Sequence, residues 1–290
     1  MNELQTSIND YLNYCKTQKR LDEKTLKAYR IDLRQFSEQI SVHKNTEIDS
    51  SVIEKHIAAL HHKYQPKTVK RKIASLKAFF HFLEYKDLIE KNPFTRIEIH
   101  FREPVRLPKT IPLHTAETLL TTIYTWQKSA KATHQKRCSL RDAAVVELLF
   151  ASGMRISELC TLHAKDVNLF DGIILIYGKG SKERRIQIGN ESVLCTLKKY
   201  QSDFQLEIEH CGHFFANSNG KALSDQSVRR MIKKYAALAG IDMHITPHMF
   251  RHTFATSLLE ADVDIRYIQE MLGHSSIHIT EIYTHVAIAK

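Results

Sequence analysis

The 290-residue sequence lacks any apolar run that approaches the roughly 18–20 residues needed to span a bilayer, and its mean hydropathy is −0.32. Its first residues also lack a charged segment followed by an apolar stretch, so we expect no secretion signal. The five cysteines are widely spaced without a CxxC pair, and none of the 17 histidines lies in an HExxH motif. These absences predict a soluble, cytoplasmic protein with reduced thiols, no membrane segment and no metal site.

Acidic residues are missing from one long stretch of the chain. Between Lys55 and Leu83 there is no Asp or Glu, whereas seven lysines and arginines fall there. The net charge is +10 overall, and residues 1–110 hold 21 Lys+Arg against 14 Asp+Glu. Such a surplus is typical either of a solvated helix face or of a surface that binds DNA phosphates, and the sequence leaves both readings open.

The spacing of apolar residues predicts a mainly helical protein with two domains. In residues 1–100 apolar residues recur every three or four positions, which indicates four helices. Ser50 is the expected cap of the third helix, and Pro66 suits the first turn of the fourth. Three prolines within residues 101–112 predict an extended linker, so we expect a helical domain over 1–100 and a second domain over 113–290.

The second domain is expected to combine helices with a small β-sheet. Two β-rich runs, 172–177 and 184–188, flank a glycine-containing segment and predict a hairpin. Helical patterns cover roughly 115–128, 140–152, 190–209, 225–239, 247–260 and 264–272.

Two short segments before residue 180 place charged side chains at turns. Gly153 breaks a helix, and Arg155 and Glu158 then lie one turn apart, as a surface ion pair or as part of a site. Lys179 lies between two glycines at the hairpin turn. It is either exposed to solvent or able to reach into a groove, because glycines let the backbone approach a ligand closely.

Two further segments lie near the C-terminus. Thr246 and Pro247 predict a helix start, which places His248 and Arg251 about one turn apart on one face. This arrangement suits a phosphate or is simply a capped helix with polar residues facing solvent. Gly273 is the expected end of the preceding helix, ahead of His274, and Tyr283 follows nine residues after that histidine.

The order of these residues resembles the tyrosine recombinase (phage integrase) family, and most closely its Xer-like members. The matching text is Ser152-Gly-Met-Arg-Ile-Ser-Glu-Leu159, Gly178-Lys-Gly-Ser-Lys-Glu-Arg184, Thr246-Pro-His-Met-Phe-Arg-His-Thr-Phe-Ala255, Leu272-Gly-His-Ser275 and Ile282-Tyr-Thr-His285. The resemblance covers essentially the whole chain, and it implies a helical, SAM-like DNA-binding domain followed by a mixed α/β catalytic domain.

The resemblance also implies the chemistry. Tyr283 would attack a DNA phosphodiester and form a 3′-phosphotyrosyl intermediate, with His248 as base and Lys179 as general acid. Arg155 and Arg251 would neutralise charge on the non-bridging phosphate oxygens, and His274 would donate a further hydrogen bond. Glu158 would orient neighbouring side chains, and neither a metal, ATP nor another cofactor would be needed.

The expected partner is double-stranded DNA with paired core sites, bound by a homo-tetramer or by a hetero-tetramer with a paralogue, and the protein would be nucleoid-associated when DNA-bound. The candidate DNA contacts are Lys67, Lys70, Arg71, Lys77, Gln226, Arg229 and Arg230. Two alternatives remain at this point: a type IB topoisomerase with similar residues, and a DNA-binding regulator whose catalytic residues have become structural.

Overall fold

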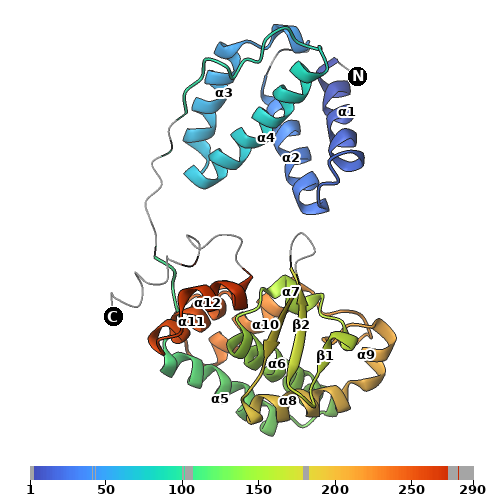
Figure 1. Cartoon of the computed structure of the whole chain (residues 1–290), viewed down its shortest axis with the longest axis vertical. Coiled ribbons are helices and arrows are strands. Elements are labelled where there is room, and N and C mark those ends of the chain that lie inside the picture. Colours follow the sequence, from blue (N-terminus) through green and yellow to red (C-terminus); the bar gives the residue numbers. More distant parts are fainter. Residues whose placement is uncertain are drawn as a thin grey trace. The chain divides into compact units, whose positions relative to one another are not determined.

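The chain folds as two compact units, residues 1–105 and 106–290, each with its own hydrophobic core. The computed structural model describes residues 3–40, 42, 44–99, 101, 107–178, 183–273 and 280. The predicted fold class, mainly helical with a small sheet in the C-terminal part, is confirmed (Figure 1). Within the described residues, none of the helices is long and apolar enough to cross a membrane.

The described part of the N-terminal unit is helical, as predicted. Its elements are α1 (Glu3–Thr17), α2 (Glu23–Gln39), a short 3-10 turn (Asn45–Glu47), α3 (Ser50–Lys63) and α4 (Pro66–Tyr85). The predicted cap of α3 is wrong by one residue, because the side chain of Asp49, and not of Ser50, accepts the Val52 N–H at 2.9 Å. Pro66 is the first residue of α4, where its missing N–H has no helical partner to lose.

The C-terminal unit is built around a buried helix. Its helices are α5 (Leu113–Ser129), α6 (Thr133–Ser152), α7 (Ile156–Cys160), α8 (Glu191–Asp203), α9 (Gln205–Cys211), α10 (Asp225–Leu238), α11 (Pro247–Glu260) and α12 (Ile265–Leu272), with a 3-10 turn at Ala164–Asp166. Every residue from Asp142 to Leu149 is buried, and α6 packs against α5, α8 and α11. A helix that is buried on all sides requires such surroundings.

The described strands form an antiparallel sheet in the order β1 (Val167–Asn168), β2 (Ile173–Tyr177), β3 (Glu183–Gln187). The predicted hairpin is therefore confirmed, with Ile174 opposite Ile186 and Ile176 opposite Arg184. Side chains alternate between the faces of a strand, so Arg184 lies on the same face as the buried Ile186.

Three features of the helices and strands differ from the sequence-based expectation. Helix α6 begins at Thr133 and not near 140, because its first turns are polar and carry no apolar period. The expected helix over 190–209 is broken at Phe204, a buried residue that ends α8 and precedes α9. Strand β1 has only two residues, too few to show an alternation.

The described end of the predicted linker is attached to the C-terminal unit. The Ile111 N–H donates to Thr253 Oγ1 of α11 at 2.8 Å, and the Ile111 side chain is buried in the core of this unit. Pro112 then precedes the first residue of α5.

Candidate active site

The turn after α6 requires glycine. Gly153 ends the helix in the left-handed conformation at φ +57°, which confirms the predicted break. A Cβ atom at this position would lie 2.4 Å from Cδ1 of Phe254. Only a residue without a side chain fits, and it leads the chain directly into α7, with Arg155 as the N-cap.

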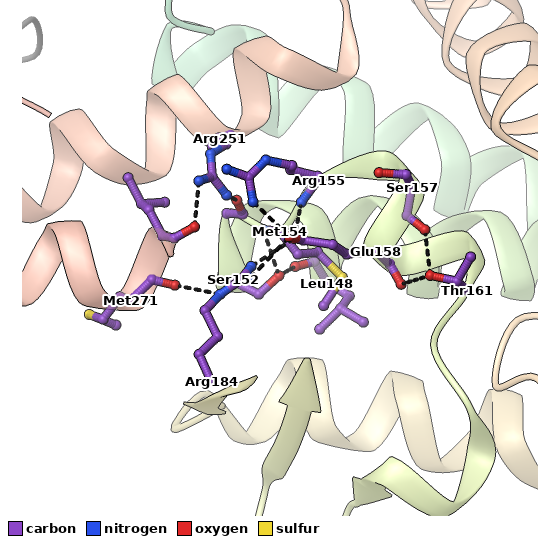
Figure 2. Close-up of polar contacts among 12 residues, drawn as sticks. Leu148, Ser152, Met154, Arg155, Ser157, Glu158, Thr161, Arg184, Arg251 and Met271 are labelled. Carbon is purple, nitrogen blue, oxygen red and sulfur yellow. Dashed lines mark hydrogen bonds and ion pairs between the residues drawn. The ribbon is translucent and has the colours of Figure 1, made fainter. Parts of the chain in front are cut away.

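The Glu158 carboxylate binds two arginines at once (Figure 2). Its Oε2 accepts the backbone N–H of Arg155 at 2.7 Å, and its Oε1 accepts Nη1 of the same residue at 2.7 Å. Nη1 and Nη2 of Arg184 donate to the same two oxygens at 3.0 and 2.7 Å. The Glu158 side chain is only 6% exposed, so the interpretation of Arg155 and Glu158 as a surface ion pair is wrong.

The surroundings of Glu158 keep it ionised. Burial by itself raises the pKa of this carboxyl, but the bonds from Arg184 and then Arg155 outweigh burial and hold the pKa below its ordinary value. Charge-assisted, paired hydrogen bonds of this kind are among the strongest that side chains make. Arg155 keeps 36% of its side chain exposed, whereas only 8% of Arg184 is exposed.

Arg251 lies in the second turn of α11 and is buried. Its Nη1 donates to the Gly153 carbonyl at 2.9 Å, and its Nη2 donates to the Leu272 carbonyl at 2.5 Å. Nε of Arg184 donates to the Met271 carbonyl at 2.9 Å (Figure 2). The last carbonyls of a helix have no hydrogen-bond partner within the helix. Arg184 and Arg251 therefore supply donors to two of these carbonyls at the C-terminal end of α12.

Two histidines lie near Arg251 on α11. His248 is exposed in the first turn, as predicted. His252 is half-buried, and burial, followed by the nearby His248 and Arg251, lowers its pKa to about 4. His252 is therefore neutral at pH 7. Thr246 precedes the helix as expected, although its side chain makes no capping hydrogen bond.

Three predicted catalytic residues, Lys179, His274 and Tyr283, lie outside the described residues. The structure describes what flanks two of them. Tyr177 and Glu183 pair across the hairpin on either side of the Lys179 segment. Gly273 ends α12 at φ +64°, as predicted, and directly precedes His274.

The predicted DNA contacts are all exposed within their own units. Lys67, Lys70, Arg71 and Lys77 lie on the surface of α4, and Gln226, Arg229 and Arg230 on the surface of α10. The acid-free stretch is not uniform, however. Lys72 is buried and binds Asp32 Oδ1 at 3.0 Å, and the guanidinium of Arg71 also binds Asp32.

Arg184 is the site residue to which the sequence reasoning assigned no role. The available signal was the alternation along β3, which places Arg184 on the same face as Ile186 and Ile188, both buried. An arginine on a core-facing position requires a carboxylate or carbonyl partner. Among the described residues, no group of three or more His, Cys, Asp and Glu side chains is arranged to hold a metal ion.

Comparisons with known proteins place both units. Residues 119–290 match the phage integrase family, and residues 8–86 match its N-terminal SAM-like domain. The chain is 68% identical to a tyrosine recombinase of Agathobacter rectalis, over all of this chain and 95% of that protein. It is 36% identical to tyrosine recombinase XerC of Thermodesulfovibrio yellowstonii, over 99% of this chain and 93% of the relative.

Solved structures have the same fold. The XerH site-specific recombinase bound to its palindromic difH substrate, in a post-cleavage complex, aligns with a TM-score of 0.75. The alignment covers 95% of this chain and 80% of that one at 24% identity, which shows the fold alone. The crystal structure of XerA recombinase is 29% identical, with a TM-score of 0.54, over 99% of this chain and 96% of the other.

Proposed function

The chain belongs to the phage integrase family of tyrosine recombinases, and we propose that it is a site-specific recombinase that cleaves and rejoins double-stranded DNA at paired core sites. The observation that carries the proposal is the junction at Gly153. There Arg155 follows within two residues, and Arg251 from a helix nearly a hundred residues later binds the Gly153 carbonyl. Two arginines from distant segments are thereby held at one turn.

A pair of arginines is suited to a phosphodiester in the transition state of cleavage. The guanidinium is planar, keeps its charge at every relevant pH, and makes paired hydrogen bonds to phosphate oxygens. The contacts of Arg251 with the Gly153 and Leu272 carbonyls orient its guanidinium before DNA binds. Such preorganised donors stabilise the charge that develops on the non-bridging oxygens.

In the proposed reaction the Tyr283 oxygen attacks phosphorus, and the bond from phosphorus to the 5′-oxygen breaks. His248 accepts the tyrosine proton, Lys179 gives a proton to the departing oxygen, and His274 donates a hydrogen bond to the phosphate. The products are a 3′-phosphotyrosyl linkage and a free 5′-hydroxyl. Because the covalent linkage retains the energy of the broken bond, the reverse attack by a 5′-hydroxyl reseals DNA without ATP or another cofactor.

We further propose that both units bind the duplex and that four subunits act together. Exposed cations on α4 and on α10 suit the phosphate backbone and the base edges respectively. Exchange of two duplexes requires four strand cleavages, which a homo-tetramer, or a hetero-tetramer with a paralogue, would supply. The protein would work in the cytoplasm and be nucleoid-associated when bound.

A nicked suicide duplex tests the proposal. The full chain is incubated with duplexes from its own locus that lose a short fragment after cleavage, and a covalent protein–DNA adduct is sought on a denaturing gel. We expect an adduct with the wild-type chain, none with Tyr283→Phe, and no effect of EDTA. Loss of the adduct in EDTA would contradict the metal-free mechanism.

The same assay separates the alternatives. Adducts on arbitrary DNA, together with relaxation of supercoils and no strand exchange, would identify a topoisomerase. Specific DNA binding with no adduct on any locus duplex would identify a regulator. The wild-type chain and Tyr283→Phe bind DNA equally under our proposal, because the substitution removes the nucleophile and leaves every cation in place.

A further inference from the structure

We propose that Arg184 is a positioning residue for strand cleavage, which orients Arg155 through Glu158 and fixes the end of α12 directly before His274. The inference rests on the proposed function. It assigns a role to a side chain that is only 8% exposed and that contacts both Glu158 and the Met271 carbonyl.

The Arg184 guanidinium is buried and bound by several acceptors. Arg184 lies on the core-facing side of β3 with 8% of its side chain exposed, next to buried isoleucines. A buried guanidinium is tolerated only when a carboxylate and further acceptors compensate for lost hydration. Glu158 supplies both of its oxygens and Met271 its carbonyl, so Nε, Nη1 and Nη2 of Arg184 each have an acceptor.

Arg184 and Arg155 share the two carboxylate oxygens of Glu158. Oε1 of Glu158 accepts from Nη1 of both arginines, and Oε2 accepts from the Arg155 backbone and from Nη2 of Arg184. The fork of Arg184 therefore sets the plane of the carboxylate. Because the same carboxylate holds both the backbone and the guanidinium of Arg155, its plane determines where that guanidinium points.

Arg184 also contacts the C-terminal end of α12. Arg184 binds the Met271 carbonyl, and a Cβ atom built on Gly273 would lie 3.2 Å from Nη1 of Arg184. The arginine thus packs against the residue that immediately precedes His274. One side chain joins β3, α7 and the C-terminal end of α12, which are three of the segments that carry family motif residues.

Replacement of Arg184 should therefore slow cleavage without weakening DNA binding. Lysine keeps the positive charge but offers a single nitrogen, which cannot reach both carboxylate oxygens and a carbonyl in the guanidinium arrangement. A displacement of catalytic groups by about 1 Å costs on the order of 100-fold in rate. We expect Arg184→Lys to lower the single-turnover cleavage rate by about that factor and to leave the Kd for the suicide duplex unchanged.

The matched control is the neighbouring residue. Arg185 is on the same strand and exposed, so Arg185→Lys makes the same chemical change on the opposite face. We expect it to cleave at the wild-type rate. Thermal unfolding of each variant fixes a temperature at which all are folded, and rates are compared there.

A double-mutant cycle with Glu158→Gln distinguishes positioning from general destabilisation. If Arg184 acts through Glu158, the double variant cleaves no more slowly than the slower single variant. Three results would each overturn the inference. In the first, the rate losses of the two single variants multiply in the double variant. In the second, Arg184→Lys weakens DNA binding with an unchanged cleavage rate, and in the third it cleaves as fast as Arg185→Lys. A wild-type chain that forms no adduct would instead refute the proposed function. In that case the same double-mutant cycle is measured by the free energy of unfolding, and additive losses of stability in the double variant would overturn the link between Arg184 and Glu158.

Discussion

Each unit contains a buried carboxylate that is shared by two cations. The two arrangements differ in the other groups that these cations contact. In the N-terminal unit Asp32 of α2 binds Arg71, Lys72 and Ser75, all of which lie on α4. In the C-terminal unit Glu158 of α7 binds Arg155, the N-cap of that helix, and Arg184 on β3.

The partners of Asp32 contribute mainly to holding two helices together. Nζ of Lys72 also bonds Oε1 of Gln35 on α2 at 2.5 Å and lies 4.9 Å from the centre of the Tyr64 ring, within the same helical bundle. Of the two partners of Glu158, Arg184 also binds the Met271 carbonyl, and Arg155 keeps 36% of its side chain exposed. The same local chemistry therefore stabilises the fold in one unit and positions a candidate site in the other.

The largest effect on stability is expected from Asp32→Ala. It leaves Lys72, only 5% exposed, without its anionic partner, which should lower the free energy of unfolding by about 3–5 kcal/mol. Urea unfolding of the full chain measures the loss. Glu38→Ala on the same helix is the control, because that carboxylate is 63% exposed and its pair with Arg34 is worth about 1 kcal/mol at most. An Asp32 variant that is as stable as the Glu38 variant would contradict the comparison.

The next effect separates the two arginines at Gly153. Arg251→Ala should lower the cleavage rate about 100- to 1000-fold and also destabilise the C-terminal unit, since two carbonyls lose their donor at about 1–3 kcal/mol each. Arg155→Ala should slow cleavage by a similar factor with a smaller loss of stability, because Glu158 keeps Arg184. Suicide-duplex cleavage and urea unfolding are measured on both variants. Equal losses of stability would show that burial does not distinguish them.

Two glycines with the same conformation provide a third test. Gly153 and Gly212 have φ of +57° and +69°, but nothing lies within 4 Å of a Cβ built on Gly212. Gly212→Ala should cost only the left-handed strain, about 1–2 kcal/mol. Gly153→Ala adds the overlap with Phe254, for about 3 kcal/mol in total, and should also slow cleavage. Similar unfolding energies and unchanged cleavage in both variants would show that this turn is not a constraint on the site.

The smallest effect depends on pH in the N-terminal unit. Burial, followed by the charge of Lys72, lowers the pKa of His56 to about 4, and its Nδ1 is buried without a hydrogen-bond partner among the described residues. A depressed folded-state pKa means that stability is present above the ordinary value near 6.5 and is lost as the pH falls toward 4. At pH 5 the loss should be about 2 kcal/mol relative to pH 7.

His56→Gln removes this titration and should reduce the loss of stability between pH 7 and pH 5; the part that remains is expected from His252, whose pKa is also lowered to about 4. Urea unfolding at both pH values measures the difference. A wild-type profile that is already flat, or an unchanged slope in the variant, would show that folding does not lower the pKa of His56.

Much of the helical framework could be predicted because its signals are local. The apolar period of α1, α2 and α4, the proline at the start of α4 and the glycines after α6 and α12 all act within a few residues of where they stand. The polar start of α6 and the two-residue β1 were missed since neither carries a period. The motif order of the candidate site was likewise readable, with Arg155 and His248 at helix starts and Arg251 about one turn after His248 on α11.

Local sequence patterns were enough to predict most of the helices, the hairpin and several charged residues near helix ends. Packing between distant segments determines which of the charges are buried and which groups share them. Lys72 and Arg184 look like other basic residues in the chain, but they meet Asp32 and Glu158 from segments 40 and 26 residues away. The physical reason is that desolvation and hydrogen bonding depend on neighbours brought together by packing, and a local pattern contains no information about those neighbours.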